Sequence, residues 1–255
     1  MQLVFKFSKE CPNGVSHFIL SWCITRDYLR KLKLLRRYTC ALDLTEFDIG
    51  FKQSSHPRKL NAIGVMFHMT EATPCKILKK LQKMQPHQTL VVTSANAWTG
   101  WNISIPRQQE CNILKNMIGL PTQPLINVLH VRCGDTVSFG FTTDKELTHV
   151  TPDVMTKLCA RIRNEFNDYI VITDSDRLYE MLHKRKCDEY RRHSNYSQPS
   201  KQFLSDVSAL IRAKTVINVS NYNQPSCFSF LFSRLSHGNY TPVFISDFIS
   251  GHPIS

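Results

Sequence analysis

The chain has 255 residues, of which 42% are hydrophobic and 20% charged, with 9 glycines and 12 prolines. These values exclude collagen-like, low-complexity and wholly disordered chains, and the length allows one large domain or two small ones. Lys and Arg outnumber Asp and Glu by 32 to 20, which gives a formal charge of +12. Such an excess favours an anionic partner, which can be a nucleic acid, an acidic lipid or a phosphorylated small molecule.

The nine cysteines are scattered along the chain, and none forms the CxxC pair that structural zinc sites use. We interpret them as reduced thiols, most of them in the core. The N-terminal segment lacks the apolar stretch of a signal peptide, and no run of about 20 apolar residues is long enough to span a membrane. These patterns favour a cytoplasmic protein of bacterial or viral type, unless the chain is a truncated luminal domain.

Strands and helices alternate in the first half of the chain, which favours parallel strand pairing. The predicted elements are a strand at 1–10, a helix at 16–37, strands at 38–44 and 63–69, a helix at 74–84, a strand at 89–93 and a helix at 111–120. The helix at 16–37 carries basic residues opposite its apolar face. We interpret these residues as a solvated face, and the alternatives are peripheral membrane contact through residues 26–37 or RNA binding.

Residues 121–124 (PTQP) form the predicted linker, because two prolines in four residues break regular structure. They separate an N-terminal domain, 1–122, from a C-terminal domain, 125–255. The elements predicted beyond the linker are a strand at 125–131, a helix at 152–164, a strand at 169–173, a helix at 176–184, a loop at 187–201, a helix at 203–214, a strand at 215–219, a helix at 226–235 and a strand at 243–246. We therefore predict an α/β fold of two Rossmann-like halves that face each other across a cleft.

A polar segment follows the strongest predicted strand of the second half. His130 and Arg132 are two residues apart near the end of this strand, so their side chains are expected on one face, where parallel sheets bind ligands. An arginine there can bind phosphate through paired N–H groups, and a neighbouring histidine can donate a hydrogen bond. The alternative is a structural polar cluster that contains an Arg–Asp pair.

Residues 130–135 (HVRCGD) resemble the His-x-Arg-x-Gly-Asp signature of the fucosyltransferases that make α1,2 and α1,6 linkages or O-fucosylate proteins. Segments 13–18 (NGVSHF), 171–176 (VITDSD) and 217–232 (INVSNYNQPSCFSFLF) resemble further parts of that family in the same order. The resemblance implies a GT-B fold and inverting, metal-independent transfer of fucose from GDP-fucose to a glycan or protein acceptor. Cys133 stands where many members have a second arginine, so GDP-mannose and UDP-xylose remain alternative donors.

The resemblance also implies roles for single residues, with no metal site and no cofactor besides the donor. Arg132 would hold the donor diphosphate and assist its departure. The other residues expected at the donor are Asn13, Gly14, His130, Asp174, Asp176, Phe228 and Ser229. The catalytic base stays open among Glu10, His17 and Asp135. Asp174 and Asp176 also spell the DxD motif of metal-dependent glycosyltransferases, an interpretation that we do not favour.

Two other classes of protein remain as alternatives. A basic nucleic-acid-binding protein would use the +12 charge and the basic segments at 26–37 and 184–192. A catalytically inactive protein with a sugar-nucleotide fold would bind the donor without transferring it.

Overall fold

The computed structural model describes residues 1–7, 14–44, 66–70, 72–95, 107–118, 126–133, 150–183, 190–192, 201–221, 226–235 and 238–254. The chain divides into two compact units, one of Met1–Leu120 with Tyr196–Pro199 and one of Pro121–Asn195 with Ser200–Ser255. The predicted linker at 121–124 lies outside the described residues.

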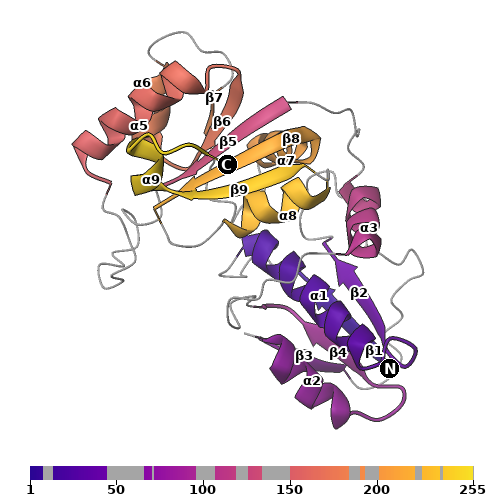
Figure 1. Ribbon diagram of the computed structural model, residues 1–255. Helices are drawn as coiled ribbons and strands as arrows, with labels where there is room; N and C mark the ends of the chain where they lie inside the picture. Colours follow the sequence, from indigo (N-terminus) through magenta and orange to yellow (C-terminus); the bar gives the residue numbers. More distant parts are fainter. Residues whose placement is uncertain are drawn as a thin grey trace. The chain divides into compact units, whose positions relative to one another are not determined.

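The described part of the first unit contains a parallel sheet in the order β2-β1-β4-β3 (Figure 1). Its elements are β1 (Gln2–Lys6), α1 (Gly14–Lys31), β2 (Thr39–Asp43), β3 (Met66–Met69), α2 (Pro74–Gln82), β4 (Thr89–Val92) and α3 (Gln108–Ile118). Phe18 of α1 packs edge-on against Phe5 and Phe7, with ring centroids 5.6 and 5.5 Å away. These contacts bury α1 on the sheet.

The second unit contains a parallel sheet whose described strands lie in the order β7-β6-β5-β8-β9. Its elements are β5 (Ile126–Arg132), α5 (Pro152–Glu165), β6 (Tyr169–Thr173), α6 (Asp176–His183), β7 (Tyr190–Arg192), α7 (Lys201–Arg212), β8 (Ala213–Ser220), α8 (Cys227–Leu235), β9 (Asn239–Phe244) and α9 (Ile245–Ile249). Counted within this unit, the order is 3-2-1-4-5, which is that of a Rossmann-like sheet. The prediction of an α/β fold is confirmed.

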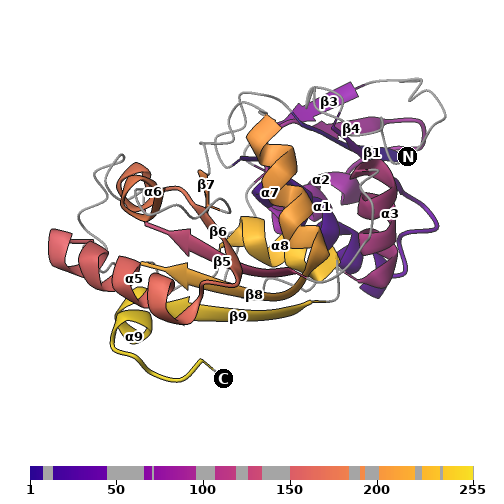
Figure 2. The same cartoon turned by 90° about the horizontal axis from the view of Figure 1, so that it is seen from above.

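The two faces of the second sheet have different roles. Figure 2 shows α7 and α8 on the opposite side of the sheet from α5 and α9. Leu129 and Val131 of β5 belong to a buried core that includes residues of α5, α6 and α9. Because side chains alternate along a strand, His130 and Arg132 are directed toward the α7 and α8 side.

Two helices begin with the same local signal. Thr73 precedes Pro74 at the start of α2, and its hydroxyl oxygen accepts a hydrogen bond from the backbone N–H of Lys76 at 3.3 Å. Thr151 and Pro152 do the same for α5. A threonine cap followed by proline is favourable because the proline lacks an N–H that the first helical turn would leave unbonded.

Three predicted boundaries are wrong. The helix predicted to Arg37 ends at Lys31, because Lys33 adopts a left-handed φ of 56° that stops the helix. The predicted loop at 187–201 contains β7, a short edge strand. The last strand begins at Asn239, and residues 245–249 form α9.

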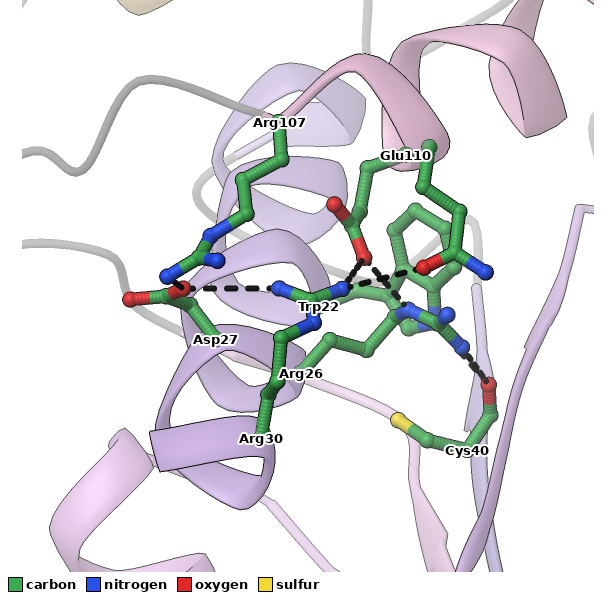
Figure 3. A network of polar contacts seen from close by, with 8 residues as sticks. Trp22, Arg26, Asp27, Arg30, Cys40, Arg107 and Glu110 are labelled. Carbon is green, nitrogen blue, oxygen red and sulfur yellow. Dashed lines mark hydrogen bonds and ion pairs between the residues drawn. The ribbon is translucent and has the colours of Figure 1, made fainter. Parts of the chain in front are cut away.

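The prediction of a solvated basic face on α1 is also wrong for two of its arginines (Figure 3). Nε of Arg26 and Nη2 of Arg30 both donate to Oε1 of Glu110 in α3, at 3.0 and 2.6 Å. Arg26 also donates to the carbonyl oxygen of Cys40 at 3.1 Å, and its guanidinium lies 5.1 Å from the ring centroid of Trp22. Glu110 is buried, so it neutralises two guanidinium groups inside the first unit.

Candidate functional site

The carboxyl edge of the second sheet is the candidate functional site. Between β5 and β8 the strand order reverses, and Rossmann-like sheets bind ligands at this point outside the ends of the strands. Arg132 ends β5 and is paired in register with Ser220, the last residue of β8. The backbone N–H of Asn221 donates to the carbonyl oxygen of Arg132 at 3.3 Å. The two strand ends are therefore held side by side.

Asn218 is the central residue of a buried polar network behind this edge. Its side-chain Nδ2 donates to the carbonyl oxygen of His130 at 3.1 Å and lies 3.3 Å from Nδ1 of the same histidine. Its Oδ1 accepts from the backbone N–H of Ser226 at 2.8 Å and from the hydroxyl of Tyr240 at 2.9 Å. Through these bonds one side chain joins β5, β8, β9 and the start of α8.

The network also determines the form of His130. Because Oδ1 of Asn218 accepts from two donors, the amide orientation is fixed and Nδ2 faces the imidazole. An amide nitrogen only donates, so Nδ1 of His130 acts as the acceptor and the proton of the neutral ring is on Nε2. His130 is thereby held in the tautomer whose Nε2–H is a hydrogen-bond donor.

His130, Phe228 and Ser229 are all buried. The ring of His130 packs edge-on against Phe228 at 6.0 Å, and Phe228 packs against Phe232 at 5.2 Å. The hydroxyl of Ser229 lies 3.4 Å from the hydroxyl of Tyr240. These side chains support the edge from within the protein, and their predicted contact with a donor nucleotide stays a prediction.

Arg132 is half-buried and lies two residues after His130, whose ring contacts Phe228 in the first turn of α8. Burial raises the pKa of Cys227 to about 11, and the positive charge of Arg132 acts in the opposite direction by favouring the thiolate. Burial likewise raises the pKa of Tyr240, and Arg132 is among the groups that oppose this rise. The first turn of α8 contains no acidic residue. A guanidinium and the positive end of a helix dipole therefore reinforce each other here.

Asp174 joins the ends of two neighbouring strands. Its Oδ1 accepts from the backbone N–H of Cys133 at 2.8 Å, which connects the residue after β5 to the residue after β6. The next residue, Ser175, accepts the backbone N–H of Leu178 at 3.2 Å and so caps α6. Asp176 is the first residue of α6, and its side chain lies outside the description. Among the described residues no group of three or more His, Cys, Asp or Glu side chains is arranged to hold a metal ion.

The structure brings five of the predicted site residues to or behind one edge of the second unit: His130, Arg132, Asp174, Phe228 and Ser229. Gly14 is the first residue of α1 and His17 lies in its first turn, so both belong to the first unit. Glu10, Asn13 and Asp135 lie outside the described residues.

Sequence reasoning missed three residues of the network: Asn218, Ser226 and Tyr240. Asn218 gave a usable signal, because it is a polar residue within the apolar run TVINV and a buried amide requires partners. Tyr240 gave none, since its partner lies 22 residues earlier in the chain.

Comparisons of the chain with protein-family models, curated proteins and solved structures give no match. None of the described helices combines the length and the apolar character needed to cross a bilayer.

Proposed function

We propose that the carboxyl edge of the second sheet binds the diphosphate of a sugar nucleotide, and that the chain is a glycosyltransferase with GT-B architecture. The observation that carries this proposal is the position of Arg132, which ends β5 where the strand order reverses, two residues after His130 and its contact with Phe228 in the first turn of α8. A guanidinium donates paired hydrogen bonds to phosphate, and helix N-terminal amides add further donors. The resemblance of residues 130–135 to fucosyltransferases favours GDP-fucose as the donor, with GDP-mannose and UDP-xylose as alternatives.

The proposed reaction requires stabilisation of the leaving diphosphate and removal of a proton from the acceptor. The bond between the anomeric carbon and the diphosphate oxygen breaks, and the diphosphate leaves with the electron pair. The acceptor oxygen attacks the opposite side of the anomeric carbon and gives its proton to a base, which inverts the configuration. Arg132 and the amides of α8 would stabilise the negative charge on the leaving diphosphate. Glu10, His17 and Asp135 remain the candidates for the base.

The buried network contributes to this proposal by positioning. Asn218 fixes the start of α8 against β5, so the amides of the helix and the guanidinium of Arg132 keep a constant relation. Donors that are already in place need little reorganisation and lose little entropy when charge develops. They therefore stabilise a leaving group effectively.

Nucleotide titration tests the proposal directly. Calorimetry and thermal shift with GDP, UDP, GDP-fucose and other sugar nucleotides are performed on the full chain, with and without EDTA. We expect GDP and GDP-fucose to bind in EDTA, and Arg132→Gln to weaken that binding at least roughly tenfold through loss of a charge-assisted pair. Lys214→Gln is the matched control, because exposed Lys214 lies near the start of β8, at the opposite edge of the same sheet.

The outcomes separate the alternatives. Preference for UDP would retain the nucleotide site and replace the donor. Donor binding without transfer or hydrolysis would identify an inactive sugar-nucleotide protein. Absence of any nucleotide response, or equal binding by Arg132→Gln and the parent chain, would contradict the proposal.

A further inference from the structure

The amino-terminal edge of the first sheet forms one surface from two connections that are distant in sequence. The α1–β2 connection and the last turn of α2, which leads into the α2–β4 connection, meet there, because the hydroxyl of Tyr38 donates to the carbonyl oxygen of Leu81 at 3.2 Å. The backbone N–H of Thr39 donates to Met1, and that of Gln2 donates to Gln88, each at 3.2 Å. We call this surface the basic edge and define it by its exposed residues Lys31, Leu32, Lys33, Arg36, Arg37 and Lys83.

The positive charge of the basic edge is not neutralised by acidic residues of the segments that form it. Residues 28–42 and 72–95 contain no Asp and no Glu. Lys31 forms an ion pair with Asp27 at 2.9 Å. In the described ranges, Lys33, Arg36, Arg37 and Lys83 form no ion pair. Within the described part of the chain, these four cations of the basic edge have no acidic partner, which favours an external anionic one.

The backbone holds one of these cations in an unfavourable conformation. α1 ends in a Schellman motif, in which the N–H of Lys33 donates to Arg30 at 2.9 Å and that of Leu34 to Leu29 at 2.7 Å. Lys33 occupies the left-handed position of this motif, with φ 56°, where glycine is favoured. A lysine at such a position costs stability, and strain of this kind is concentrated at functional surfaces.

Apolar side chains lie among the cations. Leu32, between Lys31 and Lys33, is 51% exposed, and Tyr28, one turn earlier on α1, is 42% exposed. An exposed leucine flanked by lysines matches the interface of a bilayer, where the apolar side chain enters the acyl boundary and the cations contact the headgroups. The phosphate backbone of a nucleic acid would bind the cations, but it would make no favourable contact with an exposed leucine.

We propose that the basic edge binds the surface of membranes that contain anionic lipids, with Leu32 inserted between the headgroups. The cations supply the long-range attraction and the leucine supplies a short-range apolar contact, the two-part arrangement that reversible membrane binding requires. This proposal does not depend on the nucleotide site, because none of its residues belongs to the second unit.

Vesicle sedimentation of the full chain tests the proposal. The vesicles contain phosphatidylcholine alone or phosphatidylcholine with roughly 30% phosphatidylserine, a fraction that gives the negative surface potential of a cytoplasmic leaflet. We expect binding to the anionic vesicles only, and weaker binding as salt shortens the Debye length. Each cation near such a surface contributes roughly fivefold to the partition coefficient, so Arg36→Gln with Arg37→Gln should lower it roughly thirtyfold.

Two further variants distinguish lipid from other polyanions. Lys157→Gln with Lys214→Gln removes the same charge from exposed positions of the second unit and should leave vesicle binding nearly unchanged. Leu32→Ser should weaken vesicle binding at least roughly fivefold and leave binding to a single-stranded RNA oligonucleotide unchanged. Equal binding to neutral vesicles, equal loss in the control pair, or RNA binding without vesicle binding would overturn the proposal.

Discussion

Asn218 donates through Nδ2 to the carbonyl oxygen of His130 at 3.1 Å, and this bond connects the two strands between which the second sheet reverses its order. The other end of the same amide accepts from Ser226 and Tyr240. One buried side chain therefore determines how β5, α8 and β9 meet at the candidate site. Removing it takes a hydrogen bond from each of His130, Ser226 and Tyr240 inside the protein.

The first prediction concerns this residue. Asn218→Ala should lower the free energy of unfolding by about 2 to 4 kcal/mol, because the loss of one partner costs the desolvation of each group left behind. Urea unfolding of both proteins measures the difference. Asn127→Ala is the control, since Asn127 forms a single long bond of 3.5 Å with Asp168 near the surface. A loss below about 1 kcal/mol for Asn218→Ala would show that the network contributes little.

The local pattern of the sequence predicted much of the fold. Buried parallel strands are continuous apolar runs, and the run at 169–173 gave β6 with its observed bounds. The prediction that most cysteines are core thiols is confirmed among the described residues, where Cys75 is exposed and the rest are buried. The end of α1 could not be predicted, because the residue in the left-handed position is a lysine.

The candidate site was predictable only in part. Arg132 follows from a strand that ends in a polar segment, and the strand period places it on the face of His130. Arg26 and Arg30 both contact Glu110, which lies 84 and 80 residues later in the chain. Spacing along α1 carries no information about a contact at that distance, so a solvated face was the expected and incorrect interpretation.

Thiol reactivity gives the second prediction. Burial raises the pKa of Cys40 to about 12 and that of Cys227 to about 11, so both stay protonated at pH 8. The thiolate is the nucleophile, and we expect alkylation of the native chain at Cys75 well before either buried thiol. Peptide mass spectrometry after brief alkylation measures the order, and alkylation in urea is the control in which all three should react. Rapid native labelling of Cys40 would contradict its burial.

The third prediction is a pH dependence. Burial alone would raise the pKa of Asp27, but hydrogen bonds and charges from Lys31 and Arg107 lower it from the usual 3.8. A carboxyl whose pKa is lower in the folded chain contributes stability above pH 3.8 and loses it as the pH falls through the folded value. Asp27→Asn should therefore be less stable than the parent chain at pH 7, and the difference should shrink toward roughly pH 2. A difference that is constant with pH would contradict the ion-pair explanation.

The fourth prediction separates stability from binding at one position. Lys33→Gly should raise the free energy of unfolding by up to about 1 kcal/mol, because glycine adopts the left-handed conformation without a Cβ clash. The same change should weaken binding to anionic vesicles, since it removes one cation of the basic edge. Lys33→Ala is the control that removes the charge and keeps the strain. Thermal unfolding and vesicle sedimentation of both variants measure the two effects. Unchanged vesicle binding would show that Lys33 does not contribute to membrane binding by the basic edge.

The last prediction concerns Glu110, whose Oε1 accepts from Arg26 and Arg30 (Figure 3). Glu110→Ala should destabilise the chain by about 3 to 5 kcal/mol, because Arg26 would remain buried with its main countercharge removed. Glu165→Ala provides a comparison: Glu165 pairs with Arg161 at 2.9 Å but is about half exposed, and Arg161 keeps its hydrogen bonds to the carbonyl oxygens of Phe248 and His252, so the loss should be less than about 1 kcal/mol. Urea unfolding of the two variants measures this contrast. Arg26 and Arg161 are equally buried, each 9% exposed, whereas Glu110 is 2% and Glu165 52% exposed, so equal losses would mean that burial of the carboxylate does not control the cost of its removal.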